Sequence, residues 1–237
     1  MRLALFDIDG TLILTGGAGM RAFYRALWQV FGIRVDGEVI HPDGKTDPLI
    51  AKQVLEHFGQ SEYWNENSRA QLFAAYVSYL EEEMQQARAR GAIRVLPGVT
   101  DLLDRLSADP GFAVGLVTGN LEQGAWIKLA SAGLASYFRF GGYGSDSEDR
   151  TALIREAINR GTTLVAPAAV EASIVIGDTP LDISHGHAAG ASVVAVASAR
   201  YRTAELEPHR PDLLVPSLAP VEPILAFMRE TGQLPRF

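Results

Sequence analysis

Six short runs of apolar residues recur along this chain of 237 residues, and most of them are separated by segments with helical periodicity. Such runs are typical of strands that are buried on both faces. Strands that alternate with helices predict a parallel sheet with helices on both sides, as in a Rossmann-like, doubly wound α/β fold. The predicted strands are residues 3–6, 112–118, 137–140, 173–177, 192–197 and 212–216.

One long segment, residues 15–92, interrupts this alternation with helical patterns alone. Its first apolar stripe stops at Gly32, a natural helix end, and its second helix is predicted to start at Asp47 as the N-cap. An all-helical block after the first strand predicts an inserted helical cap domain. The predicted domains are therefore this cap and an α/β core of residues 1–14 and 93–237.

Composition limits the classes of partner. The formal net charge of −7 argues against non-specific binding of nucleic acid, which needs clustered Lys and Arg. The absence of cysteine excludes disulfides and thiolate metal sites. Asp7 and Asp9 interrupt the N-terminal apolar run, unlike in a signal peptide, and no segment has the ~20 apolar residues of a membrane span. We therefore expect a soluble, cytoplasmic protein with no nucleic-acid or membrane partner.

Polar residues gather where three of the predicted strands end. Side chains alternate along a strand, so Asp7 and Asp9 point to the same side of the first one. Two carboxylates so close repel each other and raise one pKa unless a cation lies between them. Ligands of open parallel sheets bind beyond the carboxyl ends of the strands. This edge therefore predicts a metal ion, catalysis or both, and its other polar residues are Thr11, Thr118, Asn120, Asp178 and Asp182.

Three motifs in this order resemble the haloacid dehalogenase (HAD) superfamily: DxDGT at 7–11, Thr-Gly-Asn at 118–120 and GDxxxD at 177–182. The helical insert is similar to that of the phosphoglycolate-phosphatase-like, helical-cap branch. The resemblance implies a phosphoric monoester hydrolase, namely a Mg²⁺-dependent phosphatase that acts on a small phosphorylated metabolite through an aspartyl-phosphate. The oxygen ligands and the lack of cysteine agree with Mg²⁺, which is a hard cation.

The resemblance also implies a role for each motif residue. Asp7 is expected to be the nucleophile. Asp9 is expected to protonate the leaving alcohol and then to deprotonate the attacking water. The expected phosphate-binding residues are Thr118, Gly119 and Asn120, and the expected metal ligands are Asp7, Asp9 through its backbone carbonyl, and Asp178, with Asp182 in or behind the metal shell.

The superfamily also uses a Lys or Arg that contacts the nucleophile and the phosphate, but the usual Lys-Pro is missing here. Arg150 starts the helix that leads into strand 173–177, which favours it for this role. Lys128 lies about 10 Å from the N-terminal end of its helix at 1.5 Å per residue, but its side chain leans back toward that end. A phosphate contact and a solvated position are both open for Lys128. In the cap, Lys45 either meets a second anionic group of the substrate or belongs to a polar turn.

Three other functions share parts of this pattern. A phosphosugar mutase would keep the aspartyl-phosphate, and residues 1–12 do not separate it from a phosphatase. A dehalogenase has no alkoxide leaving group to protonate, so Asp9 argues against that activity. A non-catalytic, phospho-accepting switch would show a persistent phosphorylated form and no turnover, but such receivers are shorter and lack both DxDGT and a helical cap.

Overall fold

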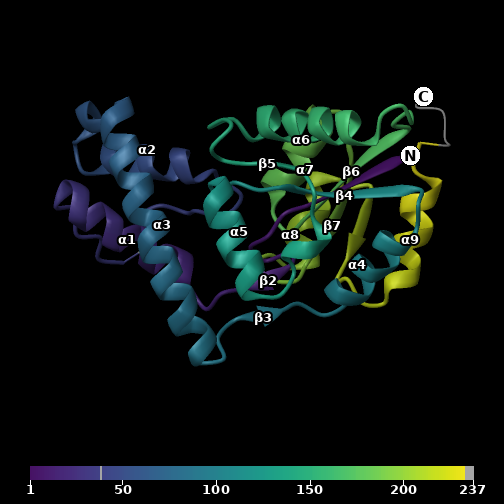
Figure 1. Cartoon of the computed structure of the whole chain (residues 1–237), viewed down its shortest axis with the longest axis horizontal. Helices are drawn as coiled ribbons and strands as arrows, with labels where there is room; N and C mark the ends of the chain where they lie inside the picture. Colours follow the sequence, from purple (N-terminus) through teal and green to yellow (C-terminus); the bar gives the residue numbers. More distant parts are fainter. Residues whose placement is uncertain (38, 233–237) are drawn as a thin grey trace.

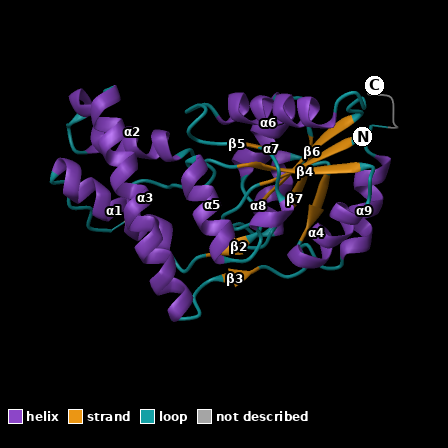
Figure 2. Ribbon diagram, in the orientation of Figure 1, coloured by secondary structure: helices purple, strands orange, loops and turns teal. Residues whose placement is uncertain are grey.

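The computed structural model describes residues 1–37 and 39–232 and confirms the predicted α/β fold (Figure 1 and Figure 2). Six parallel strands form one sheet in the order β5-β4-β1-β6-β7-β8. Their bounds are β1 (Arg2–Phe6), β4 (Phe112–Val117), β5 (Gly141–Gly142), β6 (Ala172–Gly177), β7 (Ser192–Val196) and β8 (Leu213–Val215). After β1 the chain adds β4 and β5 on one side and then β6, β7 and β8 on the other. A reversal of this kind opens a crevice at the carboxyl ends of β1, β4 and β6.

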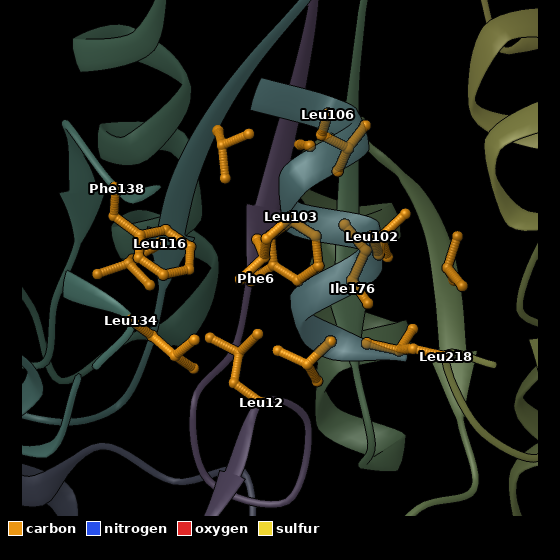
Figure 3. Packing of buried hydrophobic residues seen from close by; sticks show 14 of the residues in the cluster. Phe6, Leu12, Leu102, Leu103, Leu106, Leu116, Leu134, Phe138, Ile176 and Leu218 are labelled. Atoms are coloured by element: carbon orange, nitrogen blue, oxygen red, sulfur yellow. The ribbon is translucent and has the colours of Figure 1, made fainter. Parts of the chain in front are cut away.

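The two faces of the sheet follow from the alternation of side chains along its strands. In β1, Ala4 and Phe6 pack on one face with helices α4, α5 and α9, and Figure 3 shows Phe6 beside the leucines of α4. Leu3 and Leu5 pack on the opposite face with helices α6, α7 and α8. All four side chains are fully buried, so helices cover both faces as predicted. The helix bounds are α4 (Val99–Ala108), α5 (Glu122–Ser131), α6 (Arg150–Val165), α7 (Pro180–Ala188), α8 (Thr203–Leu206) and α9 (Val221–Glu230).

Three helices pack against one another away from the sheet, on the left of Figure 1: α1 (Ala18–Phe31), α2 (Asp47–His57) and α3 (Glu66–Ala89). Their buried side chains make up most of a hydrophobic cluster that includes Phe23, Leu55 and Tyr76 and extends to Leu121 of the core. Helix α1 ends at Gly32, whose φ of 66° is left-handed, as expected for a C-terminal glycine. This separate packing supports the predicted division into a core and a helical cap, which stays a prediction.

A pair of two-residue strands joins the two parts. Strand β2 (Ile13–Leu14) leads into the helical cap and β3 (Arg94–Val95) leads out of it. The two strands are antiparallel, with Ile13 opposite Val95 and Leu14 opposite Arg94. Strands of two residues are too short to produce a periodic pattern, so the sequence did not predict them.

Two predictions of local structure are wrong. Residues 137–140 are not a strand: the short turn of 3₁₀ helix Ala135–Tyr137 comes first, and the pairing with β4 follows at Gly141–Gly142. Helix α2 begins with Thr46 as its N-cap, whose hydroxyl accepts from the Leu49 N–H, and Asp47 is already helical. Both Thr and Asp suit an N-cap, so sequence alone cannot choose between adjacent ones. No helix among residues 1–37 and 39–232 is long and apolar enough to cross a membrane.

The remaining short turns of 3₁₀ helix are Ser61–Tyr63 in the cap and Glu207–His209 after α8.

Candidate active site

The candidate active site is a cavity of about 240 Å³ between the carboxyl edge of the sheet and the helical cap. The edge of the sheet contributes the ends of β1, β4 and β6, and the cap contributes the loop before α2 and parts of α1 and α3. The cavity is lined by the predicted residues Asp7, Asp9, Thr118, Gly119, Asn120, Lys128, Arg150, Asp178 and Lys45, together with Asp47 and Tyr76.

Three buried carboxylates form a cluster at this edge. Asp7, Asp178 and Asp182 each place a carboxylate oxygen within 4.8 Å of the other two. Burial raises the pKa of Asp7 to about 7, and the charges of Asp182 and Asp9 add to the rise while Arg150 opposes it. Burial, followed by the charges of Asp182 and Asp7, also raises the pKa of Asp178 well above its usual value. The cluster therefore carries an excess of negative charge that could hold a divalent cation.

The hydrogen bonds divide the cluster into two kinds of carboxylate. Asp182 uses both oxygens inside the protein, because Oδ2 accepts from Thr179 N (3.0 Å) and Thr179 Oγ1 (2.7 Å) and Oδ1 accepts from Arg150. Asp178 accepts from Thr11 Oγ1 at 3.1 Å through Oδ1. Its Oδ2 faces the Gly10 backbone, where a Cβ would lie only 2.3 Å away. Asp182 thus has both oxygens bonded within the protein, whereas Asp178 accepts a hydrogen bond from Thr11 through Oδ1 alone among the described residues.

Arg150 stands against this cluster. Its Nη2 lies 3.2 Å from Asp7 Oδ1 and donates to Asp182, and the residue is only 4% exposed. It is placed there by Asp149, the N-cap of α6, which accepts from Thr151 N at 2.8 Å. The Nε of Arg150 is buried and has no hydrogen-bond partner among the described residues. The guanidinium therefore has a donor to spare for an anion.

Lys128 is also buried, at 4% exposure, so the interpretation of a solvated side chain is wrong. Its Nζ donates to Asp9 Oδ2 and to Asn120 Oδ1, both at 2.6 Å. The side chain reaches back along α5 toward the strand end, as its lean predicts. Gly19 of the cap leaves space for this side chain, because a Cβ at that position would lie 3.3 Å from the Lys128 Nζ. The structure thus brings both candidate cations into the site, with Arg150 beside Asp7 and Lys128 beside Asp9.

The loop after β4 carries the predicted phosphate-binding residues. Thr118 is fully buried, and its Oγ1 accepts from the Asn120 N–H (3.2 Å) and from Asn120 Nδ2 (2.8 Å). Asn120 Nδ2 also donates to Asp9 Oδ2 at 2.7 Å. A Cβ at Gly119 would lie 2.1 Å from the backbone oxygen of Lys45. Glycine is therefore required where the cap loop touches this part of the core.

The cap side of the cavity is both charged and polar. Lys45 Nζ donates to Gln53 Oε1 at 2.8 Å. Asp47 is 8% exposed, accepts from the Leu121 N–H at 2.9 Å, and interacts electrostatically with the Tyr76 hydroxyl. Burial raises the pKa of Asp47 to about 6, although the charge of Lys128 and the Leu121 N–H oppose the rise. Sequence reasoning missed both Asp47, which looked like an N-cap, and Tyr76, which looked like one apolar position in a helical stripe.

Comparison with known proteins agrees with the fold and identifies a family. A model of the haloacid dehalogenase-like hydrolase family matches residues 4–196. Similar solved structures include a hydrolase from Pseudomonas syringae (21% identity, TM-score 0.70, 94% of this chain and 99% of that one). A protein described as a predicted phosphoglycolate phosphatase from Haemophilus somnus 129PT has 19% identity and a TM-score of 0.70, over 94% and 97% of the chains. A β-phosphoglucomutase from Clostridium difficile has 18% identity and a TM-score of 0.70, over 96% and 97%. At these identities the structures establish the fold alone.

Proposed function

Because the chain belongs to the haloacid dehalogenase-like hydrolase family, we propose that it is a Mg²⁺-dependent phosphatase acting on a small phosphorylated metabolite. One observation carries the proposal. A buried carboxylate, Asp7, lies beside a buried cation, Arg150, and a second carboxylate, Asp9, in one cavity that the cap covers. Phosphoryl transfer depends on positioning and on neutralisation of charge, and this cavity offers both.

Two displacements at phosphorus account for the hydrolysis. An Asp7 carboxylate oxygen attacks the phosphorus, and the bond from phosphorus to the alcohol oxygen breaks, while Asp9 gives its proton to that oxygen. Water then attacks the aspartyl-phosphate, Asp9 takes the proton back, and the Asp7 carboxylate leaves. Lys128 and Asn120 both contact Oδ2 of Asp9, which leaves Oδ1 for this proton.

The binding groups surround the same position. The spare Nε of Arg150, the Thr118 hydroxyl and the backbone N–H of Gly119 would bind the phosphoryl oxygens. The Asn120 N–H would join them by leaving its hydrogen bond to Thr118 Oγ1. Backbone and guanidinium donors suit phosphate oxygens because they are fixed and point inward.

A magnesium ion fits the donor set. Asp7 and Asp178 supply hard carboxylate oxygens, and burial together with the neighbouring carboxylates raises the pKa of each, which a bound cation would offset. Asp7, the backbone carbonyl of Asp9 and Asp178 would hold the ion, with Asp182 behind them. When bound, it would supply positive charge for the phosphoryl group and for the Asp7 carboxylate.

The cavity limits the substrate. A space of about 240 Å³ under the cap fits a phosphate with a short carbon chain better than a macromolecule. Lys45 reaches the cavity from the cap and would meet a second anionic group at the far end of the substrate. Phosphoglycolate has this composition and is the first compound that we would test.

The test is phosphate release from p-nitrophenyl phosphate and from a panel of phosphorylated metabolites, with Mg²⁺ and with EDTA, beside Asp7→Asn. Metal-dependent release that the variant loses would establish the phosphatase. Isomerisation of a sugar phosphate without release of phosphate would replace it by a mutase. A stable phosphorylated Asp7 with no turnover would replace it by a phospho-accepting switch. Normal release by Asp7→Asn would overturn the assignment of the nucleophile.

A further inference from the structure

Asp47 of the cap is bonded to both sides of Asn120 in the core. Its backbone N–H donates to the Gly119 carbonyl at 2.7 Å, and its Oδ2 accepts from the Leu121 N–H at 2.9 Å. One cap residue therefore fixes the backbone before and after Asn120. The contact is close, because no side chain larger than that of glycine fits at 119.

The helix does not need this carboxylate. Thr46 already caps α2. A carboxylate in the first turn would interact favourably with the helix dipole even if it were exposed to solvent, so this interaction does not require burial. Instead Asp47 is 8% exposed and interacts electrostatically with the Tyr76 hydroxyl, whose residue is 2% exposed. Burying a carboxylate costs free energy unless charged or hydrogen-bonding partners offset it. The partners here are the Leu121 N–H, the Tyr76 hydroxyl and the nearby charge of Lys128.

The side chain of Asn120 connects this part of the backbone to Asp9. Its Nδ2 donates to Asp9 Oδ2 at 2.7 Å, and its Oδ1 accepts from Lys128 Nζ at 2.6 Å. The Asn120 amide thus contacts both Asp9 and Lys128, which also bond each other. The backbone of 119–121, which Asp47 holds, carries this amide.

We propose that Asp47 is a positioning residue that holds the 118–121 loop, and through Asn120 the Asp9 carboxylate, in the reactive arrangement when the cap loop is docked. The proposal rests on the proposed roles of Asp9 and of this loop. It makes the chemistry depend on one cap residue that lies beyond the reacting atoms.

Other contacts keep the cap docked when Asp47 is changed. Asp43 Oδ2 lies 2.6 Å from Arg200 Nη1, and Trp64 Nε1 donates to Glu148 Oε1 at 3.2 Å. Neither contact involves the 118–121 loop. Substitution of Asp47 therefore tests positioning separately from docking.

The experiment compares Asp47→Ala and Asp47→Asn with Glu83→Gln. Glu83 is the matched control because it is a buried cap carboxylate, 6% exposed, whose partners Arg21 and Arg25 lie on α1. Amide hydrogen exchange is measured over residues 118–122, with β4 (112–117) as the internal reference. The kcat and KM for p-nitrophenyl phosphate are measured with saturating Mg²⁺.

We expect faster exchange at 118–122 but not in β4, and a kcat about 10- to 100-fold lower, in Asp47→Ala, since a hydrogen bond to a charged group is lost. Asp47→Asn should lie between Asp47→Ala and wild type, because its amide oxygen still accepts one hydrogen bond. Glu83→Gln should change neither quantity. Because Asn is nearly isosteric with Asp, Asp47→Asn decides the test if Asp47→Ala does not fold.

Two results would overturn the proposal: unchanged exchange at 118–122 in a folded Asp47 variant, or faster exchange with kcat within about two-fold of wild type. A wild-type protein that releases no phosphate from any substrate would contradict the proposed function instead. The exchange measurement would still decide whether Asp47 holds the loop.

Discussion

Replacing Arg150 by alanine removes the guanidinium that pairs with both Asp7 and Asp182. Three carboxylates would then remain buried within 4.8 Å of one another without that cation. Removing one partner of a buried ion pair typically costs about 3–5 kcal/mol. At roughly 2–4 °C per kcal/mol for a chain of this size, the melting temperature in EDTA should fall by about 6–20 °C.

The assay is thermal and urea unfolding in EDTA, with Arg105→Ala as the control. Arg105 is an exposed arginine that pairs with Glu222, so its loss should cost less than about 1 kcal/mol. Arg150→Lys keeps the positive charge but loses the planar guanidinium with its several donors. Its melting temperature should lie between those of Arg150→Ala and wild type. Mg²⁺ should restore part of the stability of Arg150→Ala, because the ion replaces some of the missing charge.

The deficit of Arg150→Ala should also depend on pH. Without the guanidinium the pKa of Asp7 rises further, so the folded variant binds more protons than wild type and loses relative stability as the pH rises. The deficit should therefore be smaller near pH 5 than near pH 8. An Arg150→Ala protein as stable in EDTA as Arg105→Ala at both pH values would refute the charge-balance reasoning.

Four other outcomes follow from the site. Asp7→Asn should abolish turnover with an unchanged circular dichroism spectrum, and measurable steady-state turnover would contradict the role of nucleophile. Asp178→Asn should weaken Mg²⁺ binding at least about tenfold by calorimetry, whereas equal affinity would place the ion elsewhere. The pKa of Asp47 is raised from 3.8 to about 6, so the folded state holds its proton longer, and the free energy of unfolding should fall by on the order of 3 kcal/mol as the pH rises through that window. Urea titrations should show that this fall is missing from Asp47→Asn, and a fall of equal size in both proteins would assign it to other groups. Gly119→Ala should lower kcat/KM about tenfold or more, because its Cβ would displace the Lys45 carbonyl. Wild-type kinetics in this variant would show that the cap loop at Lys45 can move without loss of activity.

The sheet could be predicted from sequence where its signals are local. Apolar runs mark β1, β4, β6, β7 and β8, and the polar residues that follow β1, β4 and β6 mark the edge of the sheet where the site lies. The sequence gives no such signal for strand β5, because two glycines have no side chains that could form an apolar run. Its glycines are needed because a Cβ at Gly142 would lie 1.9 Å from the Leu153 carbonyl of α6. Only the packed helix makes that requirement visible.

The site was predictable to the same extent. Motif residues follow strands, so the chain order alone placed Asp7 near Asp178. The end of the Lys128 side chain lies against Gly19 of the cap, which is more than a hundred residues earlier in the chain. The direction of the Asp47 side chain depends on docking against Leu121, and no pattern within α2 encodes that contact. Contacts between the cap and the core are therefore what sequence reasoning could not supply.

The short antiparallel pair β2–β3 has a consequence for chain entropy. Since Leu14 lies opposite Arg94, the ends of the whole segment 15–93 are held as neighbours. The segment is therefore connected to the core in the way that a hairpin loop is connected to its two strands. The entropic cost of closing such a loop grows only with the logarithm of its length. Lengthening, shortening or exchanging the helices between these two strands would cost the sheet little. The segment between these two strands can therefore change in length or sequence while the order and pairing of the sheet strands stay the same.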